Sequence, residues 1–102
     1  MATIAKQFLA AEPKPLPYEP AHEAALIPPL ILEGLRGYGL RCEQPGGFLT
    51  AVLANDFIEA VCRADPQSLA ALRPIAVYVY DALPSKCHGS YEIVREWLEG
   101  AR

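Results

Sequence analysis

Apolar positions recur at helical spacing along most of this chain. They predict a first helix over residues 28–40, because two prolines suit its first turn and Leu32, Leu35 and Tyr38 follow every three residues. Gly34 and two later glycines weaken this helix, but they also leave room for another helix to approach closely.

A second, longer helix is predicted from Gly46 or Gly47 to Ala64. Its apolar positions recur at three and four residues and would form one buried face: Leu49, Val52, Leu53, Phe57, Ala60, Val61 and Ala64. The polar pair Asn55-Asp56 stands in the middle of this helix and outside the apolar stripe. An amide and a carboxylate in so apolar a helix need an explanation.

The next segment begins with a strong helix-start signal. Asp65 can accept hydrogen bonds from the free amides of the first turn, Pro66 suits the first helical position, and Leu69 and Leu72 would face inwards. Pro74 removes one backbone hydrogen bond and clashes with the preceding turn. The helix should therefore kink or divide just before it.

Two helices complete the pattern. Residues 75–83 alternate β-branched and aromatic side chains and would also suit a strand, but a lone strand has no partner in this chain, so a helix is predicted. Residues 84–90 form a loop, and Ser90 caps a last helix whose buried stripe is Ile93, Val94, Trp97 and Leu98.

Residues 1–27 differ from the rest of the chain. Ile4, Phe8 and Leu9 could lie on one face of a short helix, and the proline-rich stretch 12–20 should run extended. We expect this arm to lie over the domain or over a neighbouring subunit. The predicted fold is all-α: a compact bundle of four to five short helices over residues 28–102, with an extended proline-rich N-terminal arm.

Composition limits the class of protein. With 102 residues the chain is one domain, and its 52% hydrophobic content suggests that part of the apolar surface is covered by a partner or by a second copy. The net charge of −3 argues against nucleic acid as the partner, because binding phosphates requires a concentrated basic face.

The cysteines and the N-terminus indicate a compartment. Cys42, Cys62 and Cys87 are odd in number and lack metal-ligand spacing, so free thiols in a cytoplasmic protein are expected. No signal peptide is apparent, and no apolar run is long enough to predict a membrane span.

The sequence contains only weak signals for a catalytic, metal-binding or phosphate-binding site. Cys87 and His88 are adjacent, and neighbouring residues rarely orient as a nucleophile and its base. A metal site lacks clustered ligands, since His22 is far from His88 in sequence. The Gly46-Gly47 pair lacks the lysine and the preceding strand of a phosphate-binding loop and is typical of a tight turn. No catalytic residue, metal or cofactor is predicted.

Two features could mark a binding surface. The aromatic residues Tyr78, Tyr80, Tyr91 and Trp97 fit core packing or a protein contact better than base stacking, since basic neighbours are missing. For Asn55-Asp56 three interpretations stay open: a structural role with Asn55 bonded to backbone and Asp56 solvated or paired with an arginine, a contact surface, or a catalytic acid.

The segment from about Ile27 to Leu98 resembles small proteins of unknown function encoded by bacteriophages and prophages, on two motifs. The first is P-G-G/S-F-L…N-D-L, here Pro45 to Phe57 with phenylalanine in place of the commoner leucine; the second is P…G-S…W, ending at Trp97. The resemblance implies an accessory protein of a mobile element and brings no catalytic residues. It suggests a shared scaffold of Pro45, Gly47, Phe48, Asn55, Asp56, Gly89, Ser90 and Trp97.

The expected function is therefore non-enzymatic binding of a protein in the bacterial cytoplasm, for example a host or defence complex, by a monomer or a homo-oligomer. The residues expected at the contact are Leu16, Tyr18, Asn55, Asp56, Tyr78 and Tyr80. The alternative is a homo-oligomeric sponge for a small signalling nucleotide, which would need Arg36, Arg41, Arg73 or Lys86 to converge on phosphates.

Overall fold

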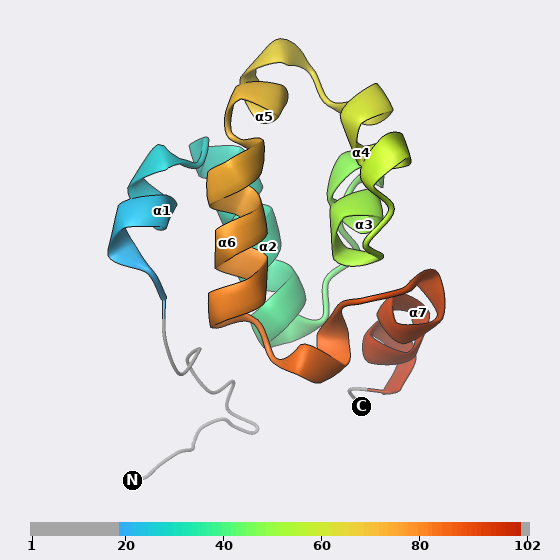
Figure 1. Cartoon of the computed structure of the whole chain (residues 1–102). Coiled ribbons are helices and arrows are strands. Elements are labelled where there is room, and N and C mark those ends of the chain that lie inside the picture. The colour runs from blue at the N-terminus through green and yellow to red at the C-terminus, as the bar shows by residue number, and fades with distance from the viewer. Residues whose placement is uncertain (1–18, 101–102) are drawn as a thin grey trace, which may run out of the picture.

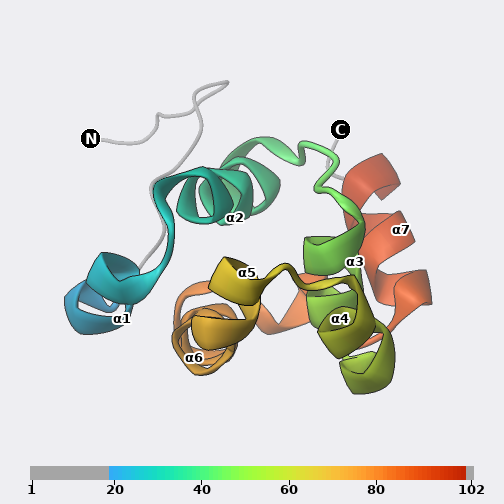
Figure 2. The same cartoon turned by 90° about the horizontal axis from the view of Figure 1, so that it is seen from above.

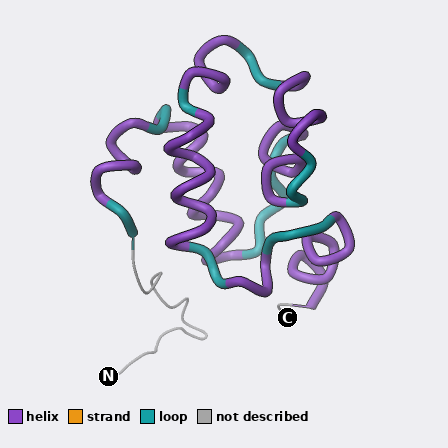
Figure 3. The backbone as a smooth tube through the Cα atoms, viewed as in Figure 1, coloured by secondary structure: helices purple, strands orange, loops and turns teal. Residues whose placement is uncertain are grey.

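The chain folds into α-helices joined by short connections. The computed structural model describes residues 19–100 and contains no strand within that range (Figure 1 and Figure 3). In chain order the helices are α1 (Ala21–Leu26), α2 (Pro29–Arg41), α3 (Gly47–Leu53), α4 (Phe57–Arg63), α5 (Pro66–Ala70), α6 (Leu72–Ala82) and α7 (Tyr91–Gly100), with a 3-10 turn, η2 (Ser85–Cys87), before α7. The all-α prediction is confirmed, including the helix rather than strand at α6.

The described chain has more helices than the four to five predicted, and two of its features were not predicted. The helix expected over 47–64 divides at Asn55-Asp56 into α3 and α4. The segment after Asp65 divides into α5 and α6, as Pro74 predicted, because proline cannot donate to the carbonyl of Ala70, where α5 ends. The second unpredicted feature is α1, which lies in the arm expected over residues 1–27, just after the proline-rich stretch expected to be extended.

Part of the arm expected over residues 1–27 is helical and packs on the rest of the chain. Residues 21–26 are helical and α1 packs against α6. The carboxylate of Glu19, just before α1, accepts two hydrogen bonds of 2.8 Å from the Arg36 guanidinium of α2 and one from the buried Tyr78 hydroxyl of α6. This cluster fixes the start of the described chain to both helices. The short helix and the rest of the proline-rich stretch predicted before it lie outside the described residues.

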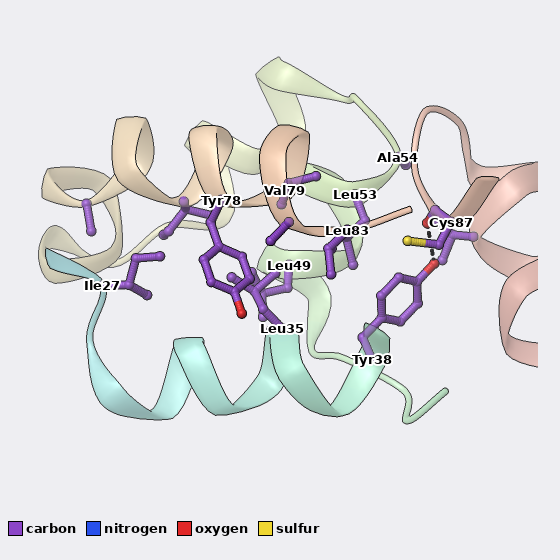
Figure 4. Packing of buried hydrophobic residues seen from close by; sticks show 14 residues of the cluster. Ile27, Leu35, Tyr38, Leu49, Leu53, Ala54, Tyr78, Val79, Leu83 and Cys87 are labelled. Carbon is purple, nitrogen blue, oxygen red and sulfur yellow. Dashed lines mark hydrogen bonds between the residues drawn. The ribbon is translucent and has the colours of Figure 1, made fainter. Parts of the chain in front are cut away.

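The core lies where α2, α3 and α6 meet. Figure 4 shows the side chains of Leu35 and Tyr38 pointing from α2 toward α6, with Leu49 and Leu53 of α3 packed among them. A Cβ added at Gly34 would lie 3.1 Å from Leu49 Cδ1, so this glycine does allow the close approach of α3.

Tyr38 joins the core to the C-terminal part of the chain. Its buried hydroxyl donates a 2.6 Å hydrogen bond to the Cys87 carbonyl (Figure 4), and its own carbonyl accepts one of 2.9 Å from Trp97 Nε1. Ser90 caps α7 as predicted, since its hydroxyl accepts from the Ile93 amide. The expected stripe of α7 packs on the core through the buried Val94 and the half-buried Trp97 and Leu98.

Candidate functional site: the α4–α6 groove

The junction between α3 and α4 explains the Asn55-Asp56 pair. Asn55 has φ +62°, in the left-handed region, which turns the chain away from the axis of α3. The backbone amide of Asn55 donates to the Val52 carbonyl at 3.0 Å, and the backbone amide of Asp56 donates to the Ala51 carbonyl at 2.9 Å. These two hydrogen bonds form a Schellman motif at the end of α3. The pair therefore lies between two helices and not in the middle of one.

Asp56 also begins the next helix. One carboxylate oxygen accepts from the Glu59 amide at 3.3 Å and caps α4, while the other accepts from the Tyr91 hydroxyl of α7 at 2.6 Å. The loop before α7 completes the junction, because the Gly89 amide donates to the Leu53 carbonyl at 2.7 Å. Of the three interpretations of the pair, the structural role agrees with these backbone hydrogen bonds. Asp56, however, pairs with a tyrosine and not with an arginine.

The divided helix also changes which side chains are buried. Leu49, Leu53 and Ala60 are buried as expected, but Phe57 is 66% exposed and Ile58 is 68% exposed. A continuous helix would have placed Phe57 in the apolar stripe; the turn at Asn55 restarts the helical phase and points it outwards. The predicted inward position of Leu69 is also wrong, since 47% of that residue is exposed.

A groove lies between this junction and α6. Figure 1 and Figure 2 both show α4 and α6 standing apart, with α5 joining them at one end. Two adjoining cavities of about 430 and 300 Å³ occupy this region and share Val52, Asn55 and Ala76. We call the pair the α4–α6 groove; its further lining includes Phe57, Ala60, Leu72, Arg73, Tyr80 and His88.

Large apolar side chains border the groove without being covered. Tyr80 is 81% exposed and lines the smaller cavity, and Phe57 is 66% exposed and lines the larger one. Single exposed apolar residues are ordinary on a protein surface, but several beside an apolar hollow are typical of an interaction site.

The charged groups at the groove are mostly engaged within the chain. Asp56 uses both oxygens as described, and the Glu59–Arg63 pair on α4 lies outside the lining of the groove. Arg73 lines the larger cavity, and no carboxylate of residues 19–100 lies within ion-pair distance of it. The larger cavity is therefore lined by one acidic residue, Asp56, and one basic residue, Arg73, which form no ion pair with each other.

His88 lines the smaller cavity and has one nitrogen without a partner. Its Nε2 is buried and makes no hydrogen bond within the described chain. Burial lowers the pKa of His88, against the opposing effect of Leu83, so the neutral ring is favoured.

The environment of Cys87 does not favour a nucleophilic thiol beside His88. Cys87 is completely buried, and burial raises the pKa of its thiol to about 12, which disfavours the reactive thiolate. All of Cys42, Cys62 and Cys87 are free thiols, and within residues 19–100 no group of three or more histidine, cysteine or carboxylate side chains could hold a metal ion.

The residues expected at a partner surface separate into three groups. Leu16 and Tyr18 lie outside the described residues. Tyr78 is completely buried and bonded to Glu19, so its assignment to a contact surface is wrong. Asn55, Asp56 and Tyr80 all lie at the groove.

Sequence reasoning overlooked the exposed positions of Phe57 and Ile58 and the groove position of Ala76, and it considered Arg73 only for a nucleotide site. The signal that could have found the first two was Asn55-Asp56 itself, since asparagine tolerates the left-handed turn and aspartate is a preferred helix cap. Interpreting the pair as the end of one helix and the start of the next would have predicted exposed side chains at Phe57 and Ile58.

The basic residues required by a nucleotide site do not gather together. Arg36 is paired with Glu19, and Arg41 is paired with Glu33 and Glu43. Of the four candidates, only Arg73 lines the groove.

Comparisons with protein-family models, with curated proteins and with solved structures find no match. None of the helices in residues 19–100 combines the length and the apolar character needed to cross a membrane.

Proposed function

We propose that this protein acts by binding another protein through the α4–α6 groove, without catalysing a reaction. The observation that carries the proposal is the position of Phe57 and Tyr80, two largely exposed aromatic side chains that line an open apolar groove. Aromatic residues around a hollow are common anchors of protein interfaces. A standard interface buries roughly 800 Å² per partner, so the contact would extend beyond the groove to neighbouring surface.

The resemblance to phage-encoded proteins supplies a biological setting for this proposal. It points to a bacterial cytoplasm and to a host, defence or phage complex as the source of the partner. A second copy of this chain is the other protein that could cover the groove.

Ala76 offers a sharp test of the proposal. It is exposed on α6 and lines both cavities, so Ala76→Arg would fill the groove while keeping a good helix former on the surface. Ala25→Arg on α1 is the matched control, because it adds the same side chain at an exposed helical position outside the groove.

All three proteins would serve as baits in lysate of a bacterial host, with bound proteins identified by mass spectrometry and each bait's fold checked by circular dichroism. We expect a specific protein that the wild type and Ala25→Arg retain and Ala76→Arg does not. The proposal fails if folded Ala76→Arg retains the same proteins as the wild type, or if none exceeds background. Sedimentation of the three purified proteins tests self-association through the groove. A dimer formed by the wild type and Ala25→Arg but not by Ala76→Arg would identify a second copy as the partner.

The nucleotide sponge is the weaker proposal, because Arg36 and Arg41 already have carboxylate partners. A nucleotide at a hundred times its dissociation constant would add about 2.7 kcal/mol to the free energy of unfolding. We expect no such stabilisation in thermal unfolding with a panel of signalling nucleotides.

A further inference from the structure

We infer that the smaller cavity of the α4–α6 groove is a small-molecule site. Its ligand is a compact, largely apolar molecule with a hydroxyl group, which makes a hydrogen bond with His88 Nε2. A protein partner is not needed for this inference, because it concerns one cavity and a ligand that fits inside it.

The nitrogen of His88 that has no partner is the observation on which the site depends. Nε2 is buried at the cavity and makes no hydrogen bond within residues 19–100. No other buried side-chain nitrogen or oxygen of the described residues lacks a partner. Since buried polar atoms are almost always paired, this one marks a place for a polar atom of a ligand.

The backbone on both sides of His88 is fixed before any ligand arrives. The Cys87 carbonyl accepts a 2.6 Å hydrogen bond from the buried Tyr38 hydroxyl (Figure 4), and the Gly89 amide donates one of 2.7 Å to the Leu53 carbonyl. Gly89 also has φ +135°, a conformation that residues with side chains rarely adopt. The histidine is therefore held in place at the cavity, and binding would not have to order its backbone.

The chemistry of the imidazole selects a hydroxyl as its partner. Burial lowers the pKa of His88, so the neutral ring is favoured, in which one nitrogen donates and the other accepts. A hydroxyl group both donates and accepts, so it can pair with Nε2 in either tautomer.

The lining of the smaller cavity disfavours a charged ligand. It contains no charged side chain, because Asp56 and Arg73 line the larger cavity and not this one. An ionised group placed there would lose its hydration without gaining a counter-charge.

The size and walls of the cavity set the rest of the ligand. Its volume is about 300 Å³, and Val52, Leu53 and Val79 contribute apolar side chains to the lining. An apolar cavity of about 150 Å³ is large enough for benzene, so this one has room for about two rings. Tyr80, which is 81% exposed, adds an aromatic side chain against which such rings can pack.

2-Naphthol is a suitable probe, because it combines two fused rings with one hydroxyl. Long-range proton–nitrogen NMR of the full-length chain would follow the imidazole nitrogens during titration. The chain has two histidines, and His22 on the exposed surface of α1 is the internal control. We expect saturable shifts at His88 Nε2 and none at His22. Naphthalene and 2-methoxynaphthalene, which cannot donate a hydrogen bond, should bind about tenfold more weakly or less.

Three variants locate the probe. Ala76→Arg should block the cavity and abolish the binding of 2-naphthol, while Ala25→Arg should leave it unchanged. Phe57→Ala should also leave it unchanged, because Phe57 lines only the larger cavity. The fold of each variant is checked by circular dichroism.

His88→Phe tests the hydrogen bond itself, because it keeps an aromatic ring and removes both nitrogens. In this variant the preference for 2-naphthol over naphthalene should disappear. If His88→Phe does not fold, the imidazole shifts of the wild type and its preference among the three compounds decide the question.

Three results would each overturn the inference. They are the absence of a saturable shift at His88 with 2-naphthol, equal affinities for 2-naphthol and naphthalene in the wild type, and unchanged binding of 2-naphthol by folded Ala76→Arg. None of them bears on the proposed protein partner, which the lysate experiment decides independently.

Discussion

The carboxylate of Asp56 accepts a 2.6 Å hydrogen bond from the hydroxyl of Tyr91, a residue 35 positions later in the chain. The same carboxylate caps α4 through the Glu59 amide, so one side chain fixes the start of α4 and attaches it to α7. The position of α4, and with it one wall of the groove, depends on this contact.

Removing this carboxylate should loosen the wall. Asp56→Ala should lower the free energy of unfolding by about 1 kcal/mol, the usual cost of losing a helix cap, with a further loss from the Tyr91 contact. Tyr91→Phe should lower it by less. Urea denaturation of both variants and their combination checks the coupling: Tyr91→Phe should have no further effect once Asp56 is alanine, and additive losses would show that the two groups do not interact.

Asn55 contributes through its backbone conformation, because its φ of +62° is costly for residues other than glycine, asparagine and aspartate. Asn55→Ala should lower the free energy of unfolding by about 1 kcal/mol, whereas Asn55→Gly should be nearly neutral. The same two substitutions at exposed Gln67, in helix α5, should rank in the opposite order, since alanine favours a helix and glycine disfavours it. Equal effects of alanine and glycine at position 55 would contradict this account.

The Glu19 cluster should give the protein an acid-sensitive contribution to stability. The Arg36 guanidinium holds the pKa of Glu19 at about 2, below its ordinary 4.5. The contribution is therefore complete above the ordinary pKa and is lost as the pH falls from there through the folded value. Because the Arg36 side chain is 38% exposed, solvent screening limits it to about 1 kcal/mol.

Glu19→Gln should accordingly destabilise the protein at neutral pH and lose less stability than the wild type on acidification. Glu33→Gln is the matched control, because Glu33 forms a more exposed pair with Arg41 and should change little. Chemical denaturation midpoints at neutral and acidic pH provide the measurement, and parallel pH profiles of wild type and Glu19→Gln would contradict the prediction.

His88 should produce a second pH dependence at a higher pH. Burial lowers its pKa in the folded chain, so the unfolded chain binds the proton more readily and stability falls as the pH drops below the ordinary value of 6.5. The lining of its cavity contains no charged side chain that would compensate the proton. His88→Gln should flatten the stability profile between about pH 7.5 and about pH 5, while His22→Gln, on the exposed surface of α1, should not.

Local signals in the sequence were sufficient for much of the secondary structure. Asp65 before Pro66 and Ser90 before α7 cap their helices as predicted, because a cap is a contact between residues three apart. The division before Pro74 is equally local, since a missing amide has the same consequence in any fold. The bounds of α2 agree with the predicted helix over residues 28–40 to within one residue, because its first turn is also set by local proline residues.

The groove depended on interactions that no local pattern contains. The sequence showed Asn55-Asp56 as an unusual polar pair. Whether the pair lay within one helix or separated two depended on hydrogen bonds from Tyr91 and Gly89, which are distant in the chain. Tyr78 and Tyr80 show the same limit: two residues of one type on one helix, of which one is buried against Glu19 and the other is 81% exposed.

By itself the sequence determined the helical class, most caps and the division at Pro74, because these follow from backbone torsions and hydrogen bonds within a few residues. Only the tertiary structure decided that Phe57 and Tyr80 stay uncovered, that Arg73 has no ion-pair partner among residues 19–100 and that the Cys87 thiol is buried. Exposure, charge balance and thiol pKa depend on which distant helices pack together, and that packing is set by the whole core.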